Sequence, residues 1–143
     1  IAVVQGPAVG SGCEIAGACD FIVATPAASF RTPEAIRGTV GATQRLPRIL
    51  GKRLAKDMMF TGRTLTAEEA RETGLIARLV SPSDLEATLE EIKKTIISAP
   101  TQSLRLAKRC IDRGVELDPK GALETEIAAI EEQLANGQWM GKR

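Results

Sequence analysis

The sequence predicts an α/β protein with strands and loops in its first half and helices in its second half. Short apolar runs bounded by glycine and proline, such as Ile1–Gln5, are typical of buried strands. After Gly51 the apolar residues recur at helical spacing instead. With 143 residues, of which 43% are hydrophobic, the chain can bury one core without disulfides.

The first half is expected to hold three short strands, one helix and one loop. Gly6-Pro7 ends the first strand, and the sequence Gly-Ser-Gly at 10–12 opens the helix. From Ile1 to Phe30 the charged side chains are Glu14 and Asp20, so the stretch should be interior and each carboxylate needs a partner or a role. The expected elements are strands at 1–5, 20–24 and 29–31, a helix at 13–18 and a loop at 33–43.

The second half is expected to be helical, with one further strand. Thr66 should cap a helix that Gly74 ends, and Pro119 should occupy the first turn of a helix capped by Asp118. The sequence at 83–86 has the pattern of a capping box. The expected elements up to residue 80 are helices at 52–60 and 67–73 and a strand at 75–80. Next comes a helix that Pro100 breaks, with an apolar stripe formed by Leu85, Leu89, Ile92 and Ile96. A helix at 102–113 follows, and a last helix, with an apolar stripe formed by Leu123, Ile127, Ile130 and Leu134, stops near Gly137.

The composition excludes several classes of function. The chain has no His, which excludes Ser-His-Asp and Cys-His catalysis and His-ligated zinc. Aromatic residues make up 3% of the chain and the net charge is +1, so neither base stacking nor a phosphate-binding face is expected, and nucleic acid is not an expected partner. The three cysteines have no CxxC spacing and are expected to be reduced core thiols. No apolar run is long enough to predict a membrane span.

Two carboxylates and a glycine-rich loop are the candidate site. The loop at Gly10, Ser11 and Gly12 does not fit GxGxxG or a P-loop, and it is either a tight turn or a set of backbone N–H groups that favours an oxyanion. Glu14 lies in the first helical turn, where it either compensates the helix dipole or does chemistry. Glu34 alone is an ordinary loop carboxylate. Together they provide the groups for acid–base chemistry beside a polarised carbonyl.

Several spaced blocks resemble the crotonase (enoyl-CoA hydratase/isomerase) superfamily. The segment IAVVQGPAVGSGCEIAGACD at 1–20 is similar to the signature of that superfamily, and ASFRTPE at 28–34 is similar to its next block. The match continues in order with TQRLPR at 43–48, TGR at 61–63, AEEA at 67–70 and Gly74-Leu75. The resemblance implies a partial crotonase-like ββα spiral followed by a helical C-terminal region.

The resemblance also implies a reaction and the roles of the site residues. The substrate would be a thioester of coenzyme A, and no cofactor or metal beyond it is expected. Ser11 matches the position of an oxyanion-hole N–H that is usually glycine, with Gly10 and Gly12 binding substrate beside it. Glu14 matches the glutamate that activates water, and Glu34 the one that exchanges a proton at the α-carbon. Both together favour a hydratase of fatty-acid or branched-chain acyl-CoA metabolism; the alternatives are an enoyl-CoA isomerase and a non-catalytic scaffold or incomplete fragment.

The organisation implied by the resemblance is that of the C-terminal part of a crotonase-type subunit. Residues 1–80 would be the spiral core with both glutamates, and residues 81–143 a helical oligomerisation region. The partners would be an acyl-CoA and further copies in a homotrimer or homohexamer, although packing within one chain is the alternative for the helices. The protein is expected in the cytoplasm or the mitochondrial matrix. The preceding half of such a subunit, which would supply the second oxyanion N–H and much of the surface for coenzyme A, is absent from these residues, so alone they are expected not to be a competent hydratase. The loop after Glu34 is also shorter than usual, and the segment at 138–143 differs from the usual closing segment.

Overall fold

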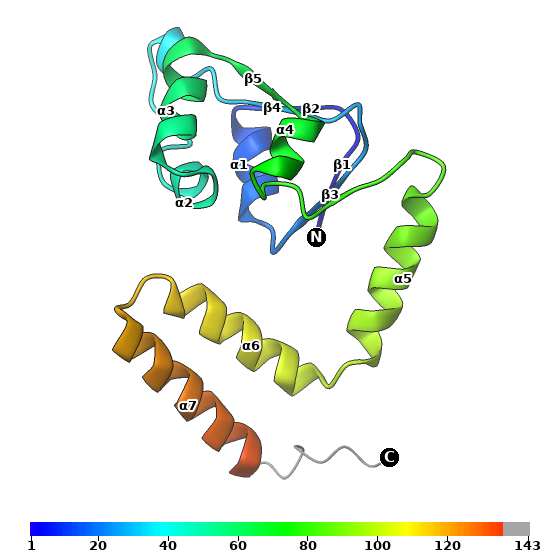
Figure 1. Ribbon diagram of the computed structural model, residues 1–143, viewed down its shortest axis with the longest axis vertical. Coiled ribbons are helices and arrows are strands. Elements are labelled where there is room, and N and C mark those ends of the chain that lie inside the picture. Colours follow the sequence, from blue (N-terminus) through cyan, green and yellow to red (C-terminus); the bar gives the residue numbers. More distant parts are fainter. Residues whose placement is uncertain (136–143) are drawn as a thin grey trace. The chain divides into compact units, whose positions relative to one another are not determined.

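The computed structural model describes residues 1–135 (Figure 1). The chain divides into two units, Ile1–Thr88 and a second unit that begins at Leu89, and α5 (Leu85–Ser98) contains the point of division. The predicted division into 1–80 and 81–143 stays a prediction, as does the assembly role of the second part. None of the helices within residues 1–135 combines the length and apolar character needed to cross a bilayer.

The first unit contains two small sheets of three strands each. The first sheet is parallel and has the order β1 (Ala2–Val4), β3 (Ile22–Ala24), β6 (Arg78–Leu79). In the second sheet β4 (Ser29–Arg31) is central, with β2 (Pro7–Val9) parallel on one side and β5 (Thr64–Thr66) antiparallel on the other. Helix α1 (Ser11–Ala18) connects β2 to β3, and the predicted α/β class is confirmed.

The remaining elements of the first unit follow β4. A 3₁₀ turn, η1 (Ala35–Arg37), precedes α2 (Arg45–Leu50), α3 (Lys52–Thr61) and α4 (Ala67–Glu72). The core is one cluster of buried apolar side chains from both sheets and these helices. Its largest fully buried members are Phe30, Ile22, Leu46, Met58, Leu65 and Ile76.

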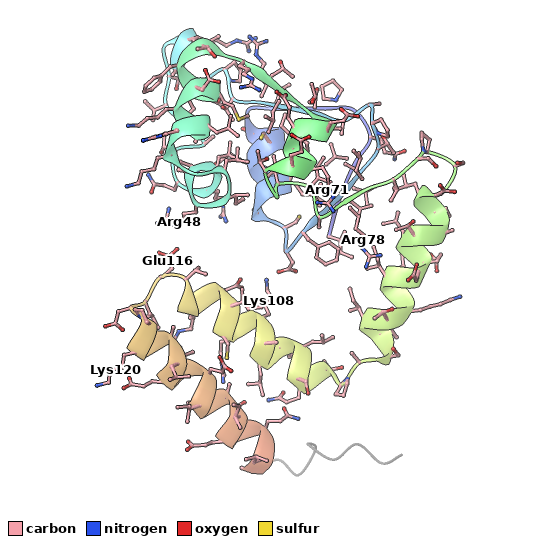
Figure 2. The ribbon with its side chains drawn as sticks, viewed as in Figure 1. Arg48, Arg71, Arg78, Lys108, Glu116 and Lys120 are labelled. Atoms are coloured by element: carbon pink, nitrogen blue, oxygen red, sulfur yellow. The ribbon has the colours of Figure 1, made fainter. Side chains whose placement is uncertain are left out.

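The second unit is built on an antiparallel helix pair. Helices α6 (Thr101–Gly114) and α7 (Pro119–Ala135) lie side by side (Figure 1). The predicted cap of α7 is confirmed, because the Asp118 carboxylate accepts the Gly121 N–H at 2.7 Å. Two labelled lysines in Figure 2 form exposed ion pairs one helical turn away, Lys108 with Asp112 and Lys120 with Glu124.

The predicted helices and strands largely match, with five corrections. Strands β2 and β5 and helix α2 were not predicted, and the strand expected at 75–80 has only two residues, at β6. The capping box expected at 83–86 is wrong, because the hydrogen bonds before α5 join Ser81 with Asp84. The expected helix end near Gly137 and the closing segment at 138–143 lie outside the described residues.

Candidate active site

Two neighbouring parallel strands, β2 and β4, position the two halves of the candidate site, which are the glycine turn and Glu34. Strand β2 leads into Gly10 and α1, and strand β4 leads through Thr32 and Pro33 to Glu34. The register pairs Val9 with Arg31, and the Gly10 N–H donates to the Arg31 carbonyl at 2.9 Å. Since both segments leave the carboxyl ends of adjacent parallel strands, residues twenty positions apart in the sequence meet at one edge of the sheet.

Gly10 makes the turn from β2 into α1. Its φ of 58° lies in the left-handed region that favours glycine, and its carbonyl accepts the Glu14 N–H at 3.1 Å. Gly10 is the N-cap of α1, and no side chain caps the helix. The exposed Ser11 therefore begins a helix whose first N–H groups lack a side-chain acceptor at the cap, which favours negative charge there. A Cβ added at Gly12 would meet no heavy atom within 4 Å.

The Glu34 side chain lies against this glycine turn. Its Oε1 is 2.9 Å from the position a Cβ would occupy at Gly10, and its Cγ is 3.0 Å from the corresponding position at Gly41. Its Oε2 is buried and makes no hydrogen bond within residues 1–135. A buried carboxylate oxygen without a donor is costly and uncommon, so it indicates a position where a ligand group or water completes the bonding.

The fully buried Cys13 thiol lies within electrostatic reach of both glutamates. Burial, then the negative charges of Glu34 and Glu14, raises the pKa of this thiol from its ordinary value of 9.0 to about 11, and a backbone hydrogen bond of Arg31 partly opposes the rise. Glu14 and Glu34 are each half-buried. The structure thus brings the predicted pair to the same side chain, with Ser11 and Gly10 beside them, while the roles assigned to these residues stay predictions.

Three residues that shape this site were not predicted from the sequence. They are Cys13, whose thiol feels the charge of both carboxylates, Gly41, which contacts the Glu34 side chain, and Arg31 at the end of β4. The available signal was the glycine content of the loop after Glu34, since a glycine beside a functional side chain often permits close approach.

Cavities in the described part of the chain lie away from the carboxylates. One of about 450 Å³ lies between α2 and α3, and its lining includes the apolar Pro47 and Met59 and basic residues such as Arg48 (Figure 2). Another of about 420 Å³ lies between α6 and α7. Within residues 1–135, no cluster of three or more Cys, Asp or Glu side chains is arranged to hold a metal.

Comparison with known proteins decides the family. A model of the enoyl-CoA hydratase/isomerase family matches residues 1–139. The chain belongs to the enoyl-CoA hydratase/isomerase family. It is 41% identical over 135 residues to a short-chain-enoyl-CoA hydratase of Clostridium acetobutylicum, covering 92% of this chain and 52% of that protein.

Solved structures agree with the predicted crotonase fold. An enoyl-CoA hydratase from Bacillus anthracis has a TM-score of 0.84 at 38% identity, over 88% of this chain and 50% of that one. A Thermobifida fusca protein described as a putative enoyl-CoA hydratase in complex with acetoacetyl-CoA has a TM-score of 0.87 at 25% identity, over 94% of this chain and 55% of that one. The chain spans about half the length of these relatives. Its assignment to the C-terminal part of a subunit stays a prediction, since these shares give lengths and not positions.

Proposed function

We propose that the intact protein containing this chain is an enoyl-CoA hydratase. The observation that carries this proposal is the Glu34 carboxylate, which lies on the Gly10 turn with one oxygen buried and unbonded while Glu14 lies in the first turn of the adjoining helix. Two carboxylates beside exposed N–H groups suit the addition of water to a double bond conjugated with a thioester carbonyl. The names of the relatives support the same reaction.

In the proposed mechanism, the Ser11 N–H donates to the thioester oxygen, where charge develops as the enolate forms. Glu14 accepts a proton from water while the water oxygen bonds to C3, and Glu34 gives a proton to C2. Water is thereby added across the C2–C3 double bond, and proton exchange with solvent restores the starting state. The addition changes no net oxidation state, so we propose no cofactor besides the coenzyme A of the substrate.

The cellular location that we propose rests on the same comparisons, and the oligomeric state rests on the second unit. The relatives named above come from bacteria, which favours the cytoplasm, and nothing supports a mitochondrial matrix. The apolar stripe of α7 is about half exposed at Leu123, Ile127, Ile130 and Leu134. We propose that further copies of the chain cover it in a homotrimer or homohexamer.

Kinetics of glutamate variants test the function. In the intact protein, Glu14→Gln and Glu34→Gln should each lower kcat for crotonyl-CoA by about 10²-fold or more while the protein stays folded, because each loses an acid–base group. Ser11→Gly should be mild, since the proposed contribution is the backbone N–H. The exposed Glu72→Gln on α4 is the control. Normal turnover in either active-site glutamate variant would remove that residue from the mechanism, and an absence of hydration by the wild-type protein would leave the isomerase or scaffold alternatives.

A further inference from the structure

Arg31 occupies a junction between the two halves of the candidate site. It is the last residue of the central strand β4, paired with Val9 of β2 and with Thr64 of β5. Its carbonyl accepts the Gly10 N–H, and Glu34 follows three residues later. The main chain of Arg31 therefore fixes the glycine turn, which leaves its side chain to act on the segment that holds Glu34.

The Arg31 side chain reaches the end of α3. Its Nε donates to the Gly62 carbonyl at 2.6 Å, in a bond that joins residues 31 positions apart. Gly62 caps α3 in the left-handed conformation, with φ of 66°, and carbonyls at a helix end have no partner inside the helix. The Arg31 Nη2 lies 3.2 Å from the position a Cβ would occupy at Gly62, so the guanidinium packs on this glycine.

The same glycine contacts the turn on the other side of Glu34. Ile36 lies in η1, and Glu34 is the N-cap of this turn. The Cδ1 atom of Ile36 packs against Gly62, in the space that a Cβ would occupy there. The Glu34 carbonyl accepts the Arg37 N–H at 3.0 Å and the Thr39 N–H at 3.0 Å, which holds the turn together. Gly62 therefore contacts Arg31, which precedes Glu34 in the sequence, and Ile36, which follows it. These two contacts form a clamp that holds the backbone on both sides of Glu34.

We propose that Arg31 is a positioning residue for Glu34, acting through the Gly62 carbonyl. The inference rests on the proposed function, because it assigns Arg31 to the proton transfer that Glu34 performs there. A misplacement of about 1 Å costs a reacting group up to about 10²-fold in rate. Loss of the clamp should therefore lower kcat, while KM, which reflects contacts with the remote coenzyme A, changes little.

The decisive experiment is a kinetic double-mutant cycle in the intact protein. Arg31→Gln should lower kcat for crotonyl-CoA by about 10-fold to 10²-fold, with KM within about 3-fold and a displaced pH profile of kcat. In the Glu34→Gln background the same substitution should change kcat less than about 2-fold, because its target is already lost. Arg31→Lys, which keeps the charge but not the planar Nε–H, should retain an intermediate kcat.

The matched control is Arg63→Gln. Arg63 follows Gly62 directly, and its guanidinium bonds to Asp57 and Glu69 rather than to the Glu34 side of the fold. It should lose some stability and keep the kcat and pH profile of the wild type. Equal losses in the Arg31 and Arg63 variants, or an Arg31→Gln effect that persists in full without Glu34, would show a merely structural role and overturn the proposal.

Amide hydrogen exchange gives a readout that does not need activity. Arg31→Gln should speed exchange of the Arg37 and Thr39 amides, which bond to the Glu34 carbonyl, and Arg63→Gln should not. If Arg31→Gln does not fold, the same comparison is made with Arg31→Lys. If a variant that lacks the Nε–H keeps both the wild-type exchange rates and the wild-type kcat, the positioning role of Arg31 is wrong. If the wild-type protein has no hydratase activity but the Arg31 variant still exchanges these amides faster, only the proposed hydratase function is wrong.

Discussion

At the scale of single residues, two glycines determine where the Glu34 carboxylate lies. Gly10 also needs its positive φ, so a side chain there combines backbone strain with a close contact. Gly41 has no such conformational demand, because its φ is not positive, and its constraint is the space taken by Glu34. Gly41 therefore separates the effect of carboxylate placement from the effect of backbone strain.

Gly41→Ala should lower kcat by about 10-fold in the intact protein and leave KM nearly unchanged. The added Cβ would lie 3.0 Å from Glu34 Cγ and 3.5 Å from its Cδ, so the side chain must shift by a few tenths of an ångström, and small misplacements of reacting groups are costly. Gly6→Ala is the control, because its Cβ would meet nothing within 4 Å. Steady-state kinetics of the two variants check this, and identical kcat values would contradict it.

The buried Cys13 thiol should make stability fall at high pH. Its pKa is raised from 9.0 to about 11 by burial and by the neighbouring carboxylates, so above pH 9 the unfolded chain loses this proton while the folded chain retains it. The free energy of unfolding should therefore fall as pH rises from about 9 to about 11, by roughly 3 kcal/mol at most. Below pH 9 this contribution is fully present.

Urea unfolding at several pH values between 8 and 11 measures this contribution of Cys13. Cys13→Ala should remove that part of the decrease, although it lowers stability at every pH by leaving a cavity. Cys19→Ala, which leaves Cys13 in place, should retain the decrease. Parallel pH profiles for the wild-type protein and Cys13→Ala would show that the thiol does not titrate as the structure indicates.

At the scale of elements, Thr66 was predicted to cap α4, and the structure shows a full capping box there. Thr66 Oγ1 accepts the Glu69 N–H at 3.2 Å, and the Glu69 carboxylate accepts the Thr66 N–H at 2.9 Å. That backbone bond, together with Arg63, lowers the pKa of Glu69. Arg63 also bonds to Asp57 on α3 at 3.0 Å, so one exposed cluster joins the start of α4 to α3.

Thr66→Ala should lower the free energy of unfolding by about 1 kcal/mol, because one N–H of the first turn loses its acceptor. Urea unfolding measures the change, with the m-value expected to stay constant. Glu68→Gln is the control, since Glu68 lies in the same turn outside the box. A loss in Thr66→Ala no larger than in the control would mean that solvent replaces the cap at no cost.

The elements that sequence analysis missed share a physical reason. Strand β2 begins with Pro7, which in the sequence indicates the end of the preceding strand, and β5 ends at Thr66, whose pattern predicts a helix cap, so local pattern assigns both segments to something else. Helix α2 contains Pro47 in its first turn, where the missing N–H costs nothing, yet a proline inside a short segment argues against a helix. The long helices α5, α6 and α7 were predicted because their stripes extend over several turns.

The site was predictable to the extent that its chemistry is local in sequence. Glu14 was found because it stands in an apolar stretch, and Glu34 because it matches, like Glu14, a block of a known family. Arg31, Gly41 and Gly62 act through contacts set by the fold: the Arg31–Gly62 bond spans 31 positions, and Gly41 matters only because the Glu34 side chain folds back over it. Local sequence pattern does not predict contacts between residues that lie this far apart in the chain.

At the scale of the whole molecule, the exposed stripe of α7 predicts self-association. Its four apolar side chains lie on one face, with exposed fractions between 46% and 56%. Replacing Ile127 and Ile130 together with Glu should reduce the sedimenting mass at micromolar concentration, because charges would have to be buried in the interface. Glu131→Gln on the same helix is the control. A wild-type protein that sediments only as a monomer would contradict the proposed trimer or hexamer.

Oxygen isotope incorporation measures directly whether the intact protein adds water across the double bond of an enoyl-CoA. Crotonyl-CoA is incubated with the enzyme in H₂¹⁸O, and the CoA products are analysed by mass spectrometry. We expect a 3-hydroxyacyl-CoA with one ¹⁸O atom, formed by the wild-type protein and at about 10²-fold lower rate by Glu14→Gln and Glu34→Gln. Conversion without ¹⁸O, as in migration of the double bond, or no conversion by the wild-type protein, would contradict it.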